Sequence, residues 1–232
     1  MNHTNIRTVL FDLDGTLADT APDLADALNV VLEERCRRTL SFDTIRPIVS
    51  HGTNALIYLG FELAPGDDGF TPIQQRLLDI YKNNIANKTR LFPGMAEVLD
   101  EIEGRGMSWG VVTNKPGYLT LPLMEALELH RRAACIVSGD TTPKRKPDPE
   151  PMFHAATLAG VEPSDCLYIG DAERDIEAGR RAGMTTLAAL FGYIGDHDNP
   201  HQWGAHGMVE HPQEILAWID KVRVPIQRQP HE

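Results

Sequence analysis

The chain has 232 residues, of which 42% are hydrophobic and 24% are charged, and this composition excludes a disordered, collagen-like or coiled-coil protein. It carries 22 Lys and Arg against 33 Asp and Glu, so its formal net charge of −11 argues against nucleic acid or an anionic membrane as a partner. The three cysteines are far apart and form no CxxC pair, so we expect neither a disulfide framework nor a zinc site.

The ends of the sequence and the length of its apolar runs indicate where in the cell the protein is expected. Residues 1–7 are polar and lack the apolar core of a signal peptide. No run approaches the roughly 18 apolar residues of a membrane span. We therefore expect a cytoplasmic protein without a membrane partner. The tail, residues 224–232, is polar and broken by prolines, and we expect it to be frayed.

The first element predicted in chain order is a strand over residues 8–11, which ends in the acidic turn 12–16. Residues 20–23 have the spacing of a helix N-terminus, and apolar residues then recur at helical intervals to about residue 35. A second helix is expected over 43–59, a loop over 64–69, and a third helical repeat from 77 to 85. We therefore expect residues 20–88 to be all-helical.

From residue 91 onward, predicted helices and strands alternate. We expect helices over 95–103, 119–127, 150–159 and 173–182, and strands over 108–113, 134–137, 166–169 and 186–190. Strands separated by helices predict right-handed βαβ units and a doubly wound parallel sheet. The simplest architecture is an α/β core (1–18 and 89–232) with an inserted helical domain (19–88).

Polar and charged residues collect where the predicted strands end, and the carboxyl ends of parallel strands meet at one rim. The candidates, strand by strand, are Asp12 and Asp14; Thr113, Asn114 and Lys115; Lys146 in the loop after the third; and Asp171 and Asp175. Four converging aspartates need a cation, and a set of carboxylates without His or Cys suits Mg²⁺. The two lysines and the Thr113 hydroxyl can donate to phosphoryl oxygens, so the pattern indicates phosphoryl transfer. The candidate substrate-binding residues at this rim are Thr113, Asn114, Lys115 and Lys146.

Four segments, in order along the chain, resemble the motifs of the haloacid dehalogenase-like (HAD) phosphatases. They are Asp12-Leu-Asp14-Gly15-Thr16, Val111-Val-Thr113-Asn114-Lys115, Lys146-Pro-Asp-Pro and Gly170-Asp171-Ala-Glu-Arg-Asp175. The helical insertion resembles the cap of the phosphoglycolate phosphatase-like branch. Within that branch, Gly192-Tyr-Ile and Asp198-Asn-Pro-His-Gln-Trp203-Gly-Ala205 are most similar to the N-acetylmuramic acid 6-phosphate phosphatases.

This resemblance implies a Rossmann-like fold and a role for each matched residue. Asp12 would attack phosphorus, while Asp14 would protonate the leaving alkoxide and then activate water. Thr113 and Lys146 would hold the phosphoryl oxygens. The Asp12 carboxylate, the Asp14 backbone carbonyl and Asp171 would bind Mg²⁺. Asp175 is expected to be an outer-shell metal partner, because Ala172 stands where many relatives have an acid or a hydroxyl.

The predicted function is Mg²⁺-dependent hydrolysis of a small phosphomonoester, with N-acetylmuramic acid 6-phosphate as the substrate. The alternatives are 2-phosphoglycolate, a mutase of the β-phosphoglucomutase type, and an inactive binding or regulatory module. His51 and Asn54 are candidates for reading the non-phosphate part of the substrate, or else they only begin a helix. The partner is expected to be a small phosphorylated metabolite, and the sequence leaves monomer and homodimer open.

Overall fold

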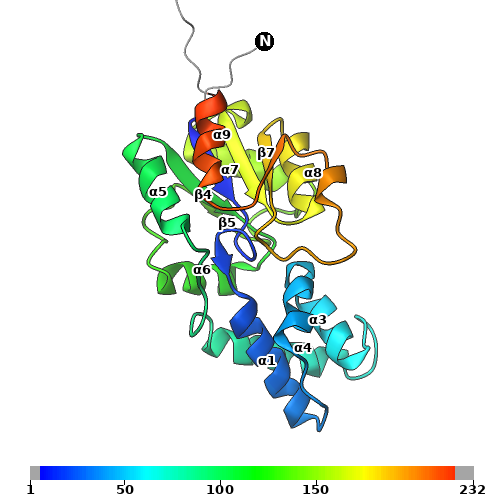
Figure 1. Cartoon of the computed structure of the whole chain (residues 1–232). Helices are drawn as coiled ribbons and strands as arrows, with labels where there is room; N and C mark the ends of the chain where they lie inside the picture. The colour runs from blue at the N-terminus through cyan, green and yellow to red at the C-terminus, as the bar shows by residue number, and fades with distance from the viewer. Residues whose placement is uncertain (1–5, 223–232) are drawn as a thin grey trace, which may run out of the picture.

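The computed structural model describes residues 6–222, and its centre is a six-stranded sheet in which every neighbouring pair is parallel (Figure 1). In sheet order the strands are β5 (Ile136–Val137), β4 (Ser108–Val112), β1 (Thr8–Phe11), β6 (Cys166–Gly170), β7 (Thr185–Ala189) and β8 (Gly207–Val209). The predicted doubly wound α/β fold with a helical insertion is confirmed.

Helices cover both faces of this sheet because alternate residues of each strand point to opposite sides. Val9 and Phe11 share an apolar cluster with α5 (Met95–Gly104), α6 (Gly117–Ala126) and α9 (Glu214–Val222). Leu10 between them belongs to a second cluster with α7 (Glu150–Ala159) and α8 (Glu173–Arg181). Strand β1 is thus buried on both faces, which accounts for its continuous apolar run.

The position of β1 in the sheet determines where a ligand can bind. It lies between β4 and β6, and Phe11 is in register with Val111 on one side and Ile169 on the other. The chain winds away from β1 in both directions, so the loops after these three strands open at a topological switch point. The candidate aspartates and the candidates Thr113, Asn114 and Lys115 follow these strands and reach the same rim, and Lys146 comes from the loop after β5.

A helical insertion lies between β1 and β4, below the sheet in Figure 1. We call it the cap, and it consists of α1 (Ala21–Glu34), α2 (Phe42–Ile45), the 3₁₀ helix η1 (Arg46–His51), α3 (Thr53–Phe61) and α4 (Phe70–Asn83). The single helix predicted over 43–59 is wrong. Pro47 lies where α2 gives way to η1, and Gly52, at φ 83°, separates η1 from α3.

Two short strands, β2 (Ala18–Asp19) and β3 (Arg90–Leu91), pair antiparallel where the chain enters and leaves the cap. Helix α1 begins where predicted, but Thr20 makes no capping hydrogen bond, because its hydroxyl donates to Asp14 at 2.6 Å. The Asp23 carboxylate instead accepts from the backbone N–H groups of Lys88 and Thr89 and from the Thr89 hydroxyl. This buried carboxylate therefore links the start of the cap, in α1, to the segment through which the chain leaves the cap before β3.

Strand β8 and helix α9 were not predicted from the sequence, and the predicted frayed tail lies outside the described residues.

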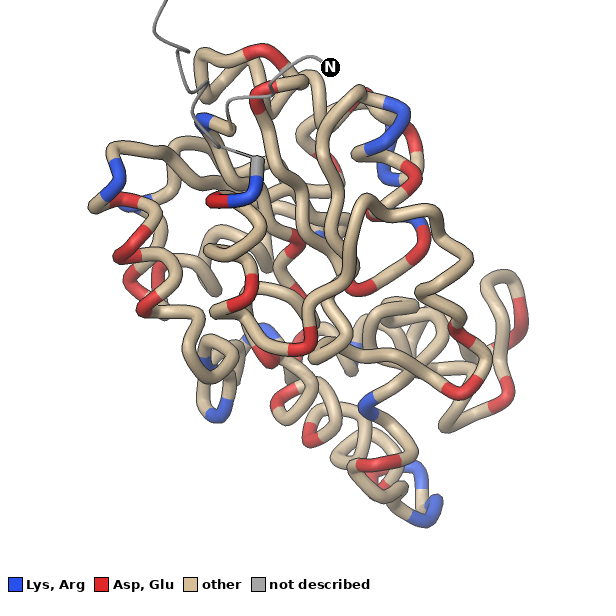
Figure 2. The backbone as a smooth tube through the Cα atoms, turned by 45° about the horizontal axis from the view of Figure 1, so that its top comes forward, with Lys and Arg blue, Asp and Glu red and all other residues tan. Residues whose placement is uncertain are grey.

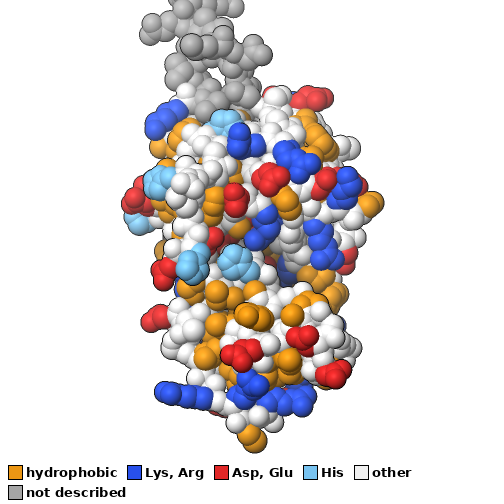
Figure 3. Space-filling model, turned by 90° about the vertical axis from the view of Figure 1, so that its right-hand side faces the viewer, with side chains coloured by type: hydrophobic (Ala, Val, Ile, Leu, Met, Phe, Trp, Pro, Cys, Tyr) orange, Lys and Arg blue, Asp and Glu red, His pale blue; other side chains and the backbone are white. Residues whose placement is uncertain are grey.

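Among residues 6–222, no helix is both long and apolar enough to cross a membrane. Acidic and basic residues are interspersed over the sheet and the cap (Figure 2). Hydrophobic side chains gather on the side of the cap that Figure 3 shows. Tyr58 of α3 is 63% exposed. The cytoplasmic location, the boundaries at residues 18 and 88, and the monomeric or dimeric state stay predictions.

Candidate active site

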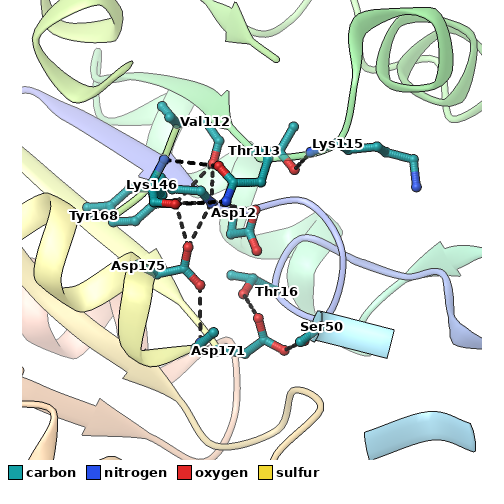
Figure 4. Close-up of polar contacts among 12 residues, drawn as sticks. Asp12, Thr16, Ser50, Val112, Thr113, Lys115, Lys146, Tyr168, Asp171 and Asp175 are labelled. Carbon is teal, nitrogen blue, oxygen red and sulfur yellow. Dashed lines mark hydrogen bonds and ion pairs between the residues drawn. The ribbon is translucent and has the colours of Figure 1, made fainter. Parts of the chain in front are cut away.

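Asp12 directly follows β1 and forms a buried ion pair with Lys146. Its carboxylate Oδ1 lies 2.8 Å from the lysine Nζ, and the two residues are each only 3% exposed. The same ammonium lies 2.7 Å from Asp175 Oδ1 and donates to the Val112 carbonyl and the Tyr168 hydroxyl, at 2.9 Å each (Figure 4). Because a buried charge is stable only when it is paired and hydrogen-bonded, these contacts fix the ammonium beside Asp12.

Asn114, a predicted substrate ligand, uses both ends of its side-chain amide on the backbone of Lys146. It donates to the Lys146 carbonyl and accepts from the Lys146 N–H, at 3.0 Å each. Asn114 follows β4, whereas Lys146 lies in the loop before α7, so the pair ties two rim loops together. Thr113 is 4% exposed, and its hydroxyl accepts from the N–H of Lys115 at 3.1 Å.

Asp171, after β6, is held by donors from three separate segments. Its Oδ2 accepts from the Ser50 hydroxyl of the cap at 2.7 Å and from the Tyr193 N–H at 2.9 Å, and its Oδ1 accepts from Thr16 at 3.4 Å. Burial and the nearby charge of Asp12 raise the pKa of Asp171 to about 7, although the donors from Ser50 and Tyr193 oppose this. The pKa of its carboxyl is therefore sensitive to any cation added beside it.

Three of the four predicted aspartates form one group, with carboxylate oxygens of Asp12, Asp171 and Asp175 within 4.8 Å of one another. Burial raises the pKa of Asp175, although Lys146 opposes the shift. When ionised, the three carboxylates outnumber the two cations beside them, Lys146 and Arg174, by one. A buried set of oxygen donors with excess negative charge fits a hard divalent cation such as Mg²⁺.

The side chain of the fourth aspartate, Asp14, lies outside this group and is bound by other donors. Its Oδ1 accepts from Lys115 Nζ at 2.9 Å and from the Thr20 hydroxyl at 2.6 Å. The Lys115 ammonium also donates to the Tyr81 hydroxyl at 2.9 Å. Burial would lower the pKa of Lys115, but the charge of Asp14 and the contacts with Asp14 and Tyr81 together outweigh burial, and the pKa is raised. Lys115 is thus a charged residue bound to Asp14.

Several of these residues line a cavity of about 420 Å³ between the sheet rim and the cap, whereas Lys146, Asp171 and Asp175 lie behind its wall. Asp12, Asp14 and Thr113 contribute to its core wall, and the predicted cap residues His51 and Asn54 contribute to the opposite wall. Typical small-molecule sites span roughly 300–1,000 Å³. The cavity is therefore large enough for a metabolite placed between the core and the cap.

Ser50, Tyr81 and Arg174 are among the residues of this site that sequence reasoning missed. Ser50 and Tyr81 come from the cap, and Arg174 lies on α8 within the segment 170–175. Arg174 lines the cavity, and the charges of Asp175, Asp12 and Asp171 raise its pKa although burial opposes them. Its place between Asp171 and Asp175 was a signal that could have identified Arg174, whereas Ser50 and Tyr81 are recognisable only after the cap is folded against the core.

The fold and site together define an α/β enzyme with a group of carboxylates beside a buried lysine, next to a cavity closed by a helical cap. The model of the haloacid dehalogenase-like hydrolase family matches residues 9–189. The chain belongs to this family.

Relatives of the chain carry two functional names. It is 42% identical over 215 residues to N-acetylmuramic acid 6-phosphate phosphatase of Pseudomonas putida, covering 93% of this chain and 96% of that protein. It is also 42% identical over 208 residues to phosphoglycolate phosphatase of Xylella fastidiosa, covering 89% and 90%. Among solved structures, a predicted phosphoglycolate phosphatase of Haemophilus somnus has a TM-score of 0.82 at 26% identity and covers 94% of this chain and 99% of its own.

Proposed function

We propose that this chain is a Mg²⁺-dependent phosphatase that hydrolyses a phosphomonoester through an aspartyl-phosphate on Asp12. The observation that carries the proposal is the buried Asp12–Lys146 pair at the core wall of the cavity, 2.8 Å between carboxylate and ammonium. Asp12 follows the central strand, so a rigid sheet supports it. A carboxylate held in this way is suited to attack a phosphorus atom in a fixed direction.

The first step forms the bond between an Asp12 carboxylate oxygen and phosphorus, and breaks the bond between phosphorus and the substrate alkoxide. Asp14 gives a proton to the departing alkoxide, since Asp14 lines the same cavity two residues further on. Lys146 offsets the charge of Asp12 that would otherwise repel the phosphoryl oxygens, and the Thr113 hydroxyl donates to one of them.

The second step regenerates the carboxylate. Asp14, now ionised, takes a proton from a water molecule that attacks phosphorus, and the bond between phosphorus and Asp12 breaks to release phosphate. Mg²⁺ would be held by Asp12, Asp171 and the backbone carbonyl of Asp14. Asp175 would not bind the ion directly but would lie next to it, where it forms an ion pair with Lys146. Bound Mg²⁺ supplies positive charge that neutralises the phosphoryl oxygens.

We further propose N-acetylmuramic acid 6-phosphate as the substrate. The named relative from Pseudomonas putida matches nearly the whole chain, including the cap. The cavity extends from the core to His51 and Asn54, which leaves room for a sugar beyond the phosphoryl group. 2-Phosphoglycolate is the second candidate, because the Xylella fastidiosa relative has the same identity over 208 residues.

Phosphate release and product identity test this proposal. The purified protein is assayed with Mg²⁺ on N-acetylmuramic acid 6-phosphate, 2-phosphoglycolate and a sugar 1-phosphate, with Asp12→Asn as the inactive reference. We expect free phosphate, with the highest kcat/KM on N-acetylmuramic acid 6-phosphate. An isomerised sugar phosphate in place of free phosphate would identify a mutase, and no turnover of any compound would leave a binding module.

A further inference from the structure

A chain of buried polar contacts joins the cap to Asp14. Tyr81 lies on α4 of the cap and is fully buried, while Lys115 follows β4 of the core. The Lys115 ammonium lies 2.9 Å from the Tyr81 hydroxyl and 2.9 Å from Asp14 Oδ1. A residue of the cap therefore helps to hold a charged group against a residue of the reaction centre.

Tyr81 provides one of the two hydrogen bonds that the described residues make to this ammonium. The Lys115 side chain is only 6% exposed, and within residues 6–222 its Nζ bonds to Asp14 and Tyr81 alone. Nζ also lies 4.5 Å from the centroid of the Tyr81 ring, so the ring attracts the charge as well. Loss of the hydroxyl would leave one N–H of a buried ammonium without its partner, and the side chain would shift to recover one.

The two oxygens of the Asp14 carboxyl have different surroundings. Oδ1 accepts from Lys115 and from Thr20, whereas no residue in the described range bonds to Oδ2. Because Oδ1 is occupied by two donors, Oδ2 is the oxygen free to exchange a proton in the cavity. Negative charge grows on this carboxyl as its proton passes to the alkoxide, and the fixed ammonium at Oδ1 stabilises that charge.

We propose that Tyr81 is a positioning residue that acts through Lys115 to set the geometry of proton transfer at Asp14. The proposal rests on the proposed phosphatase function. It gives the cap a part in the chemical step in addition to contact with the substrate. Since Tyr81 is on the cap and Asp14 on the core, the arrangement is complete only when the cap lies against the core as it does here.

The dependence on the leaving group separates this role from a structural one. Alkyl phosphates need their departing oxygen protonated, whereas p-nitrophenolate is a stable anion and leaves without a proton. We would measure kcat/KM, which covers the steps up to the aspartyl-phosphate, for N-acetylmuramic acid 6-phosphate and for p-nitrophenyl phosphate. The variants are Tyr81→Phe, which keeps the aromatic ring, Lys115→Gln, and Tyr58→Phe as a matched control on the exposed side of α3.

In Tyr81→Phe we expect kcat/KM on the sugar phosphate to fall about tenfold and on p-nitrophenyl phosphate less than about twofold, mainly through kcat. Tyr58→Phe should leave both unchanged. The double variant Tyr81→Phe/Lys115→Gln should lose no more than Lys115→Gln alone, because residues that act as a unit are not additive.

Equal losses on the two substrates, or multiplied losses in the double variant, would overturn the role of Tyr81 while leaving the phosphatase proposal intact. If Tyr81→Phe does not fold, Lys115→Gln alone still decides, since it must show the same selectivity for the sugar phosphate. A wild-type protein that releases no phosphate from either compound would overturn both proposals, so the two failures are distinguishable.

Discussion

The two walls of the cavity hold their polar groups in different ways. On the core wall, Asp12 is 3% exposed and is fixed by an ion pair to Lys146. On the cap wall, His51 and Asn54 are exposed, and the Asn54 side chain bonds only to Gln74, at 2.8 Å, among the described residues. The charged groups of the core wall are buried and paired, whereas His51 and Asn54 on the cap wall are exposed to solvent.

This difference assigns separate tasks to the two walls. A fixed, charged wall can stabilise the same phosphoryl group in every substrate, because electrostatic preorganisation acts where charge develops. Exposed polar side chains such as His51 and Asn54 can adapt to the alcohol that differs between substrates, and such contacts act through binding energy. Changes at Asp12 or in its carboxylate group should therefore affect all substrates alike, and changes at His51 or Asn54 should affect them selectively.

The largest expected effect is the loss of Asp12. Asp12→Asn should reduce kcat by at least about 10³-fold on every substrate, because an amide is a poor nucleophile. An acid quench with substrate labelled in the phosphoryl group should trap label on the wild-type protein, in a bond that hydroxylamine cleaves, and none on the variant. Asp100→Asn, on the surface of α5, is the matched control. Substantial turnover by the Asp12→Asn variant, checked for deamidation, would favour direct attack by water.

Metal removal should produce the next largest effect. Treatment with EDTA should lower kcat by about 10²-fold or more on both the sugar phosphate and p-nitrophenyl phosphate, since both depend on neutralisation at the core wall. Mg²⁺ should restore activity, and Ca²⁺ should not, because its larger and looser shell fits an in-line transfer poorly. Full activity in chelated protein would contradict a metal at the Asp12–Asp171–Asp175 group.

The core wall could be predicted from the sequence because its residues are next to strands. Thr8–Phe11 is an apolar run that stops at Asp12, and the same pattern precedes Asp171. Parallel strands bring their carboxyl ends together whatever the loops do, so Asp12, Lys146, Asp171 and Asp175 could be grouped in advance. The placement of these residues follows from local pattern and sheet topology, while their roles stay predictions.

The cap wall could be predicted only in part, because its contacts depend on how helices dock. Tyr81 has the helical spacing of a core residue, and nothing adjacent in sequence indicates that its hydroxyl meets Lys115, 34 positions away. Asp14 was expected to join the other aspartates, but Lys115 and Thr20 hold its side chain elsewhere. Helix α9 could have been predicted, because Ile215 and Ile219 have the spacing of one helix face. Strand β8 is only three residues long, which is too short to show the alternation of a strand.

The cap wall itself is tested by His51→Ala and Asn54→Ala. Each should lower kcat/KM on N-acetylmuramic acid 6-phosphate by about tenfold, which corresponds to roughly 1.4 kcal/mol of lost binding in the transition state. On p-nitrophenyl phosphate each should stay within about twofold of wild type. Gln75→Ala, an exposed residue of α4 that does not line the cavity, serves as the control. Equal losses on both substrates would place His51 or Asn54 outside substrate selection.

The smallest effect concerns stability and comes from Asp171, which is buried beside Asp12 behind the core wall. Its pKa is raised to about 7 in the folded protein, against 3.8 for the free side chain. Above pH 7 the carboxyl is ionised in both the folded and the unfolded state, and the folded state alone bears the cost of burial and repulsion. Below pH 3.8 it is neutral in both states and the cost is absent. Metal-free protein should therefore gain stability from this group as the pH falls from about 7 to 3.8.

The direction of this stability change is checked by thermal unfolding of the chelated wild type and of the Asp171→Asn variant between pH 4 and pH 7.5. The variant should melt higher at pH 7.5, by on the order of 5 °C for a chain of this size, and the difference should shrink toward pH 4. Mg²⁺ should raise the melting temperature of the wild type more than that of the variant, because the cation offsets the repulsion that the amide already lacks. A difference in melting temperature that stays constant from pH 4 to 7.5 would show that Asp171 does not titrate in this window, and the charge of the core wall would then be balanced without a metal.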